Sequence, residues 1–213
     1  MDGELHTKNL TITVIKVNKM NEAQVKKLKL QMQMTVDGYV AGPNGELDWM
    51  TWNWDEELKK YVNDLTDSVD TILLGRKMTE GFISHWSNVK PGSEEYPFAR
   101  KMVEKPKFVF TKTLEKSKWD NTSLAKSDLR EEINRIKNQP GKDIIVYGGA
   151  GFVSSLVWAD LIDEYYLFVN PAILGEGRTI FRDVEKKMVM KLADSRNFDC
   201  GIVLNQYVPD TKY

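Results

Sequence analysis

The clearest pattern near the start of the chain is an alternation of apolar and polar residues. Leu28, Leu30, Met32 and Met34 are separated by single polar residues. A period of two predicts a β-strand over residues 28–34 with one buried face. Short apolar runs predict further strands at residues 71–74, 107–110, 144–147 and 165–169. Two closing segments, 188–193 and 201–207, have the pattern of an antiparallel pair.

Helical periodicity separates these strands. Leu58, Tyr61, Val62 and Leu65 recur at i, i+3, i+4 and i+7, which predicts an amphipathic helix over residues 54–66. Asn53 and Glu56 have the spacing of a capping box for it. A second helix is predicted over 129–138 with Asp128 as its N-cap. Further helices are expected over 94–104, after Gly75 and after Gly151.

The order of these elements indicates the fold class. Strands alternate with helices, and the chain ends in strands alone. This order predicts one α/β domain over residues 28–213, with a mostly parallel sheet, helices on both faces and an antiparallel edge. Residues 1–27 differ, because the β-branched run 10–17 is followed by a polar segment. We interpret them as an N-terminal extension, either an extra edge strand or a loosely attached leader.

Composition excludes several function classes. The 213 residues carry a formal net charge of −1, which gives no electrostatic reason to expect nucleic acid or an anionic membrane as a partner. No apolar run is long enough to span a bilayer, and no secretory signal is visible. The single Cys200 excludes an intrachain disulfide and fits a reducing compartment such as the cytoplasm. With only His6 and His85 beside it, we expect no metal site.

A glycine-rich turn is the main candidate for chemistry. In KDIIVYGGAGFVSSLVW, residues 142–158, a buried strand runs through Tyr147 into Gly148 and Gly149, and a helical pattern follows. Such a turn can bring backbone N–H groups and a helix dipole close to a phosphate. It can equally be a plain strand–helix turn that uses glycine for its backbone angles. A Rossmann fingerprint is incomplete, because Ser154 stands where its last glycine or alanine belongs.

A second strand–glycine–helix junction follows residues 71–74. Gly75 is followed by Arg76 and Lys77, two cations at the positive end of a helix dipole. They can clamp a phosphate or be solvated surface residues. Trp49 and Trp52, with Trp54, are either core residues or an aromatic wall for a planar ring. Between the first strand and these tryptophans, residues 35–45 read as a long loop able to close over a ligand.

Several segments together resemble the dihydrofolate reductase superfamily, most closely the branch that contains the reductase domain of the bifunctional riboflavin-biosynthesis deaminase-reductase. The segments are TVDG with VA at residues 35–41, LGRK at 74–77, the strand 108–111, VYGGAG at 146–151 and LGEG at 174–177. Their order and spacing cover residues 29–207. The resemblance implies a three-layer α/β/α sandwich with a mixed, mostly parallel sheet and an antiparallel C-terminal edge. It also implies a homodimer.

The same resemblance implies NADPH as the cofactor. Gly75, Arg76 and Lys77 match a segment that holds the adenosine 2′-phosphate, and Thr79 matches a hydroxyl that contacts phosphate. Gly148 and Gly149 match a pair that family members often join by a cis peptide beside the nicotinamide. The remaining implied cofactor contacts are Thr111 and Lys112 at the adenine ribose, Tyr147, Ala150, Gly151, Phe152 and Val153 at the glycine-rich turn, Val40 and Ala41 over the nicotinamide, and Thr179 near its carboxamide.

The acidic residue of true dihydrofolate reductases has no aligned counterpart. The candidates for acid chemistry are Asp55, Glu56 and Glu57 at a helix start, and none aligns without a shift of several positions. Asp37 matches the Asp-Gly segment of the riboflavin branch and would contact a ribose-type hydroxyl or the loop itself. The zinc signature of the deaminase half is absent.

The sequence therefore supports three hypotheses. The first is an NADPH-dependent reductase that transfers a hydride to a small heterocyclic or ribosylamino-pyrimidine substrate, of the riboflavin-biosynthesis type. The second is an NADPH-binding or regulatory module that has lost catalysis. The third is a dihydrofolate or pteridine reductase.

Overall fold

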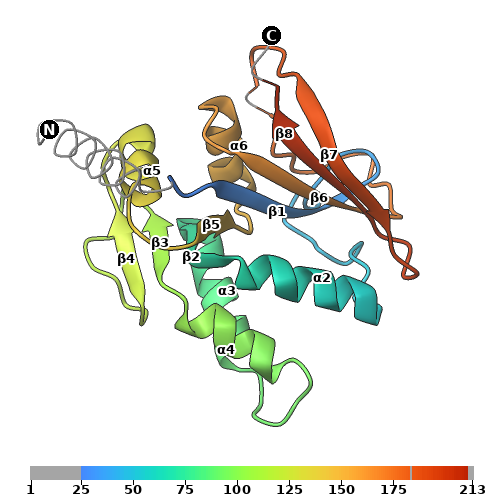
Figure 1. Cartoon of the computed structure of the whole chain (residues 1–213), viewed down its shortest axis with the longest axis horizontal. Coiled ribbons are helices and arrows are strands. Elements are labelled where there is room, and N and C mark those ends of the chain that lie inside the picture. Colours follow the sequence, from blue (N-terminus) through green and yellow to red (C-terminus); the bar gives the residue numbers. More distant parts are fainter. Residues whose placement is uncertain (1–24, 183, 211–213) are drawn as a thin grey trace, which may run out of the picture.

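The computed structural model describes residues 25–182 and 184–210, which fold around one eight-stranded sheet (Figure 1). The strand order is β4-β3-β2-β5-β1-β6-β8-β7. Six strands, from β4 to β6, run parallel, while β8 is antiparallel to both β6 and β7. The predicted α/β class with an antiparallel C-terminal edge is confirmed. The strands are β1 Leu28–Thr35, β2 Val69–Gly75, β3 Lys107–Phe110, β4 Thr122–Ala125, β5 Asp143–Val146, β6 Glu164–Asn170, β7 Met190–Asn197 and β8 Val203–Pro209.

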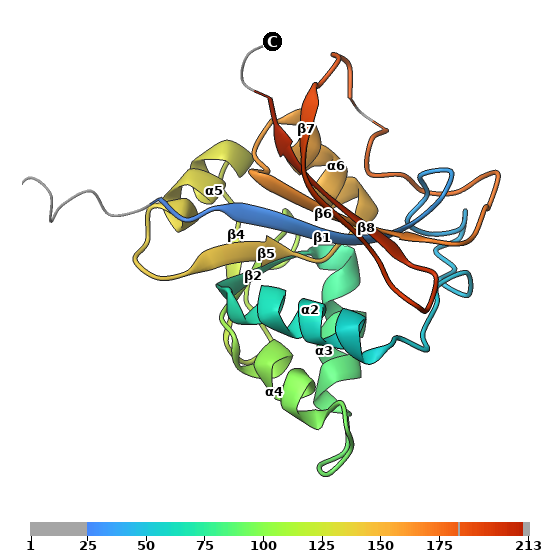
Figure 2. The ribbon, with the colours of Figure 1, turned by 45° about the vertical axis from the view of Figure 1, so that its right-hand side comes forward.

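Within the described residues, five helices cover the two faces of the sheet (Figure 2). On one face α5 and α6 enclose a core with the even-numbered residues of β1, and on the other α2, α3 and α4 pack over β2, β5 and β6. These layers form the expected α/β/α sandwich. The helices are α2 Glu56–Asp67, α3 Arg76–Ser87, α4 Tyr96–Glu104, α5 Leu129–Lys137 and α6 Ala150–Trp158. None of the helices within the described residues is both long and apolar enough to cross a membrane.

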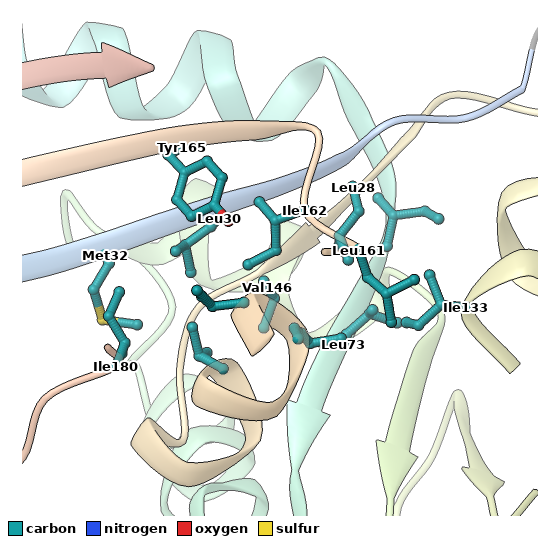
Figure 3. Close-up of a cluster of buried hydrophobic side chains, with 14 of the residues drawn as sticks. Leu28, Leu30, Met32, Leu73, Ile133, Val146, Leu161, Ile162, Tyr165 and Ile180 are labelled. Carbon is teal, nitrogen blue, oxygen red and sulfur yellow. The ribbon is translucent and has the colours of Figure 1, made fainter. Parts of the chain in front are cut away.

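The core beneath α5 and α6 is shown in Figure 3. Leu28 and Leu30 point from β1 toward side chains of α5 and of the segment after α6, while Met32 lies beside Ile180. Leu28 and Leu30 have no exposed surface. Burying each such side chain contributes about 1.5–3 kcal/mol to folding, which fixes the register of β1 between β5 and β6.

The prediction for β1 was wrong in one respect. We expected one buried face, but Lys29, Gln31 and Thr35 are also buried. The reason is that β1 lies between β5 and β6 in the middle of a sheet that has helices on both sides. A strand in that position is buried on both faces, so its polar residues had to find partners inside the protein.

Helix caps were predicted with mixed success. Asp128 caps α5 as expected, accepting hydrogen bonds from the N–H groups of Arg130 and Glu131. The predicted capping box of Asn53 was wrong, because α2 begins two residues later. Its N-cap is Asp55, which has extended backbone angles and accepts from the N–H of Leu58.

Strand β4 was not predicted, since TSLA is short and has no apolar alternation. It extends the sheet by pairing in parallel with β3. The β-branched run at residues 10–17, for which an extra edge strand or a loosely attached leader was expected, lies outside the described residues. The division of the chain at residues 27 and 28 stays a prediction.

Candidate functional site

Two strand–glycine–helix junctions lie side by side at the carboxyl edge of the sheet. They adjoin because β2 and β5 are neighbouring parallel strands, followed by α3 and α6 respectively. Gly75, at the end of β2, packs against Phe152 of α6. A Cβ atom added at Gly75 would lie 2.8 Å from the Cβ of Phe152, closer than such atoms normally approach. Glycine at this position therefore allows the two helix starts to meet.

Both of these helices begin without a side-chain cap. Neither α3 nor α6 has a capping side chain or an acidic residue in its first turn. In contrast, α2 and α5 each begin with an aspartate cap and carry two glutamates in the first turn. The first N–H groups of α3 and α6 thus have no anionic side chain to accept from them. Adjacent helix starts of this kind favour binding of an anion such as a pyrophosphate.

The glycine pair before α6 provides the turn. Gly149 is the N-cap of α6 and has φ of +85°, a left-handed conformation that favours glycine. Its carbonyl oxygen accepts from the N–H of Val153 at 2.9 Å. The peptide between Gly148 and Gly149 is trans, so the cis bond implied by the resemblance is not present. The positive φ of glycine makes the turn without it.

Two cations stand at the start of α3 as predicted. Arg76 and Lys77 are exposed, and neither has an ion pair or side-chain hydrogen bond among the described residues. Thr79, in contrast, is fully buried, and its hydroxyl donates to the carbonyl oxygen of Gly75. It closes the first turn of α3 and does not face solvent, so the contact with phosphate implied for it has no support here.

The loop after β3 lies at the same edge of the sheet, because β3 pairs in parallel with β2. The hydroxyl of Thr111 accepts from the N–H groups of Thr113 and Leu114, both at 3.1 Å, and so shapes the turn that carries exposed Lys112. Phe110 stacks on Phe152 with ring centroids 4.7 Å apart. This stack links β3 to the start of α6, where Ala150, Gly151 and Val153 follow Gly149.

Tyr147 lies on the α2 side of the sheet. Its hydroxyl is 3.2 Å from that of Thr66, and its ring stacks on Phe82. Burial raises the pKa of Tyr147 above its ordinary value, so the phenol stays protonated at neutral pH. Its hydroxyl is directed into the packing of α2, away from the glycine-rich turn.

Asp37 joins the loop after β1 to the loop after β6. Its carboxylate accepts from the hydroxyl of Thr35 at 2.5 Å and from the N–H groups of Leu174 and Gly175, the latter at 2.7 Å. These hydrogen bonds hold the pKa of Asp37 below its usual range, with Thr35 as the largest cause. Of the two roles expected for Asp37, the contact with the loop itself is the one seen.

The same two loops are joined further along. Val40 and Ala41 are nearly buried, and Ala41 forms an antiparallel bridge with Arg178. Thr179 follows, and its hydroxyl accepts from the N–H of Phe181 at 3.2 Å. The expected covering loop is therefore paired to the segment that contains Thr179.

The predicted tryptophan cluster separates into different environments. Trp54 packs into the core beneath α2, whereas Trp52 is 66% exposed and Trp49 is partly buried, with its indole N–H donating to the carbonyl of Glu46. Between them, the N–H of Thr51 donates to Oδ1 of Asn170 at 2.9 Å. This bond fixes the tryptophan loop at the carboxyl ends of β6 and β1.

The acidic candidates are held by other contacts. Asp55 accepts from the N–H groups of Leu58 and Cys200, and these bonds lower its pKa. It ties α2 to the β7–β8 connection. Glu56 is exposed and pairs with Lys59 at 2.8 Å. No group of three or more metal-ligating side chains occurs in the described part of the chain.

Two site residues were missed in the sequence. Gln33 and Asn170 lie at the carboxyl ends of neighbouring strands and bond to each other at 2.7 Å. Gln33 was assigned to the polar side of a half-exposed strand. The predicted fold could have drawn attention to Gln33, since a central strand with helices on both faces of the sheet has no side that faces solvent.

Comparison with known proteins identifies the type of domain. The family model described as "RibD C-terminal domain" matches residues 26–204. The uncharacterized protein YyaP of Bacillus subtilis (strain 168) is 32% identical, over 86% of this chain and 95% of its own length.

Solved structures share the fold. A putative riboflavin biosynthesis protein from Shewanella sp. PV-4 aligns with a TM-score of 0.67 at 22% identity, over 86% of this chain and 99% of that one. A deaminase/5-amino-6-(5-phosphoribosylamino)uracil reductase from Thermotoga maritima gives 0.63 at 19%, over 87% of this chain and 57% of that one. A dihydrofolate reductase from Enterococcus faecalis, complexed with NADP(H), gives 0.54 at 17%, over 88% and 98%. These likenesses show a dihydrofolate-reductase-like fold.

The contact between the two helix starts can be tested with alanine. Gly75→Ala should destabilise the protein by about 1–3 kcal/mol, because the new Cβ overlaps the Cβ of Phe152. The matched control is Gly151→Ala, where a Cβ meets nothing within 4 Å. It should be neutral or slightly stabilising in the helix. Urea unfolding of the three proteins measures the difference, and equal stability of both variants would refute the close contact.

The loop tie of Asp37 can be tested by exchange and pH. Asp37→Asn should speed amide hydrogen exchange of Leu174 and Gly175, because the charged acceptor is lost. Since the folded pKa is lowered, the tie is fully present above the ordinary value of about 3.9 and is lost as pH falls through the folded value. Asp48→Asn, an exposed carboxyl after the same loop, is the control. Unchanged exchange in Asp37→Asn would contradict the role.

Proposed function

The chain belongs to the RibD C-terminal domain family, and from this premise we propose that it is an NADPH-dependent reductase. Its substrate is a small heterocycle or ribosylamino-pyrimidine of the riboflavin-biosynthesis type. The observation that carries the proposal is the pair of uncapped helix starts held together at Gly75 and Phe152, with Arg76 and Lys77 beside them.

The residues at this edge fit an extended dinucleotide with two phosphate-bearing parts. The N–H groups at the start of α6 would bind the pyrophosphate, and glycines before it leave the backbone open to close approach. Arg76 and Lys77 would bind the 2′-phosphate of the adenosine ribose, since a guanidinium can donate two parallel hydrogen bonds to phosphate. Lys112 supplies a further cation at the same edge, because it follows β3, the strand that pairs with β2.

When bound, the cofactor supplies a hydride from C4 of its nicotinamide. The task of the chain is to position the reacting rings and to exclude water. The paired loops that carry Val40, Ala41 and Thr179 are suited to covering the nicotinamide, because Asp37 and the Ala41–Arg178 bridge hold them together.

We propose that neither Asp37 nor Asp55 is the proton donor. The Thr35 hydroxyl, followed by backbone N–H groups, lowers the pKa of Asp37, and backbone N–H groups lower that of Asp55, so each carboxylate remains ionised at neutral pH. Glu56 is exposed and paired with Lys59. Water at the open carboxyl edge is the remaining source of the proton.

The activity test is oxidation of NADPH at 340 nm with a panel of ribosylamino-pyrimidines, pterins and quinones. Turnover with the pyrimidines is expected. Turnover with dihydrofolate alone would favour a folate reductase, and tight NADPH binding without turnover would favour a binding or regulatory module.

The cofactor choice can be tested at Arg76. Arg76→Ala should weaken NADPH binding by about 10- to 100-fold, the effect of losing hydrogen bonds to a charged group, and should leave NADH binding nearly unchanged. Titration of intrinsic fluorescence measures both affinities. Lys90→Ala, an exposed cation beyond the far end of α3, is the control. Equal losses of affinity for NADPH and NADH would refute the proposed phosphate contact.

We also propose that the protein acts as a cytoplasmic homodimer. The supporting observation is that two apolar side chains of the β7–β8 edge are exposed, Leu192 to 52% and Val203 to 37%. Light scattering after size exclusion should give twice the 24.5 kDa of one chain. Leu192→Glu combined with Val203→Glu should give a monomer, whereas Ile173→Glu on an exposed loop should not. A wild-type monomer would refute the proposal.

A further inference from the structure

One row of side chains on β1 is polar although the strand is central. Gln31 and Gln33 share the α2 side of the sheet with their β6 neighbours Tyr166 and Phe168. The ends of the row have partners, since Lys29 pairs with Asp143 and the Thr35 hydroxyl donates to Asp37. Each of the two glutamines, however, leaves one side-chain polar atom without a hydrogen bond. Oε1 of Gln31 and Nε2 of Gln33 are buried without a hydrogen-bond partner among the described residues.

The orientation of the Gln33 amide follows from its neighbours. The backbone N–H of Thr51 can only donate, and it bonds to Asn170 at 2.9 Å, so the Asn170 atom there is the oxygen. The other amide atom of Asn170 is then the nitrogen, and it donates to Gln33 at 2.7 Å. Gln33 must offer Oε1 to this bond. Its Nε2 is therefore the atom left without a partner, whatever rule is used to assign amide groups.

A buried donor without an acceptor is costly, and natural proteins contain few of them. This one lies near the carboxyl end of a central parallel strand, the edge at which open α/β sheets bind ligands. Asn170, which positions it, has no exposed surface. Thr51, at the start of the chain of bonds, lies in the loop between Trp49 and Trp52. A ligand acceptor would complete the hydrogen bonding of this group.

We propose that Gln33 recognises the substrate through Nε2, which donates a hydrogen bond to a ring carbonyl oxygen or ring nitrogen of the heterocycle. This inference rests on the proposed function, since the heterocycle is the acceptor of the hydride. Asn170 is a positioning residue. The substrate class is thus a heterocycle that presents a ring carbonyl oxygen or ring nitrogen as a hydrogen-bond acceptor, such as a uracil or pterin.

The test replaces Gln33 by methionine, which keeps the shape and removes the amide. Calorimetric titration with 5,6-diaminouracil and with pterin, at saturating NADPH, should show binding weakened at least about 10-fold, the effect of one lost hydrogen bond of this type. NADPH affinity should be unchanged. The melting temperature should fall modestly, because Asn170 Nδ2 loses its acceptor on Gln33 and keeps only the carbonyl oxygen of Phe168.

Gln206→Met is the matched control. Its Nε2 already donates to the hydroxyl of Tyr166 at 3.1 Å on the same side of the sheet. This variant should melt at a lower temperature and should bind both probes as the wild type does.

Two results would overturn the inference. One is equal probe affinity of Gln33→Met and wild type. The other is a wild-type protein that binds neither probe. Failure of the proposed function is separate, because a chain that does not bind or oxidise NADPH can still be titrated with both probes in its absence.

Discussion

The close contact of Gly75 with Phe152 is the constraint on which the candidate site depends. It arises because β2 and β5 are parallel neighbours, so their following helices start from the same edge. A side chain at position 75 would separate α3 from α6 and would spread their free N–H groups apart. The anion binding that we propose for this edge would thus be a consequence of strand order together with one missing Cβ atom. The stack of Phe110 on Phe152 then connects the same point to β3.

The distribution of acidic residues supports this reading of the edge. Aspartates cap α2 and α5 and reduce the positive potential at those helix starts, while α3 and α6 keep theirs. Asp37 and Asp55 each accept hydrogen bonds from backbone N–H groups and so stabilise connections between distant segments. These two carboxylates therefore hold loops in place, and the hydride transfer that we propose requires no side-chain nucleophile.

Much of the fold could be predicted from local patterns, and the exceptions have physical causes. Apolar runs located β2, β3, β5 and β6, and the periodicity of Leu58, Val62 and Leu65 located α2, because these patterns reflect burial directly. The start of α2 was misplaced because Asn53 and Asp55 are both good caps and only the tertiary contact with Cys200 distinguishes them. Strand β4 has no pattern of its own and exists through pairing with β3. The glycines and cations at the starts of α3 and α6 were singled out by the sequence pattern and matched to a cofactor site by the resemblance. The burial of Thr79 and the trans peptide at Gly148 depend on packing that no single segment encodes.

The treatment of β1 shows where such reasoning loses information about function. Alternation of Gln31 and Gln33 with apolar residues is the pattern of a strand with a solvent face, yet the predicted sheet has helices on both faces. The two statements conflict, and the conflict itself points to the glutamines, since polar residues in a central strand must be bonded inside the protein or must await a ligand. Lys29 and Thr35 are bonded inside the protein, Lys29 to Asp143 and Thr35 to Asp37. Gln33 is bonded to Asn170 through Oε1 only, and its unpartnered Nε2 is the atom at which we propose that a ligand binds.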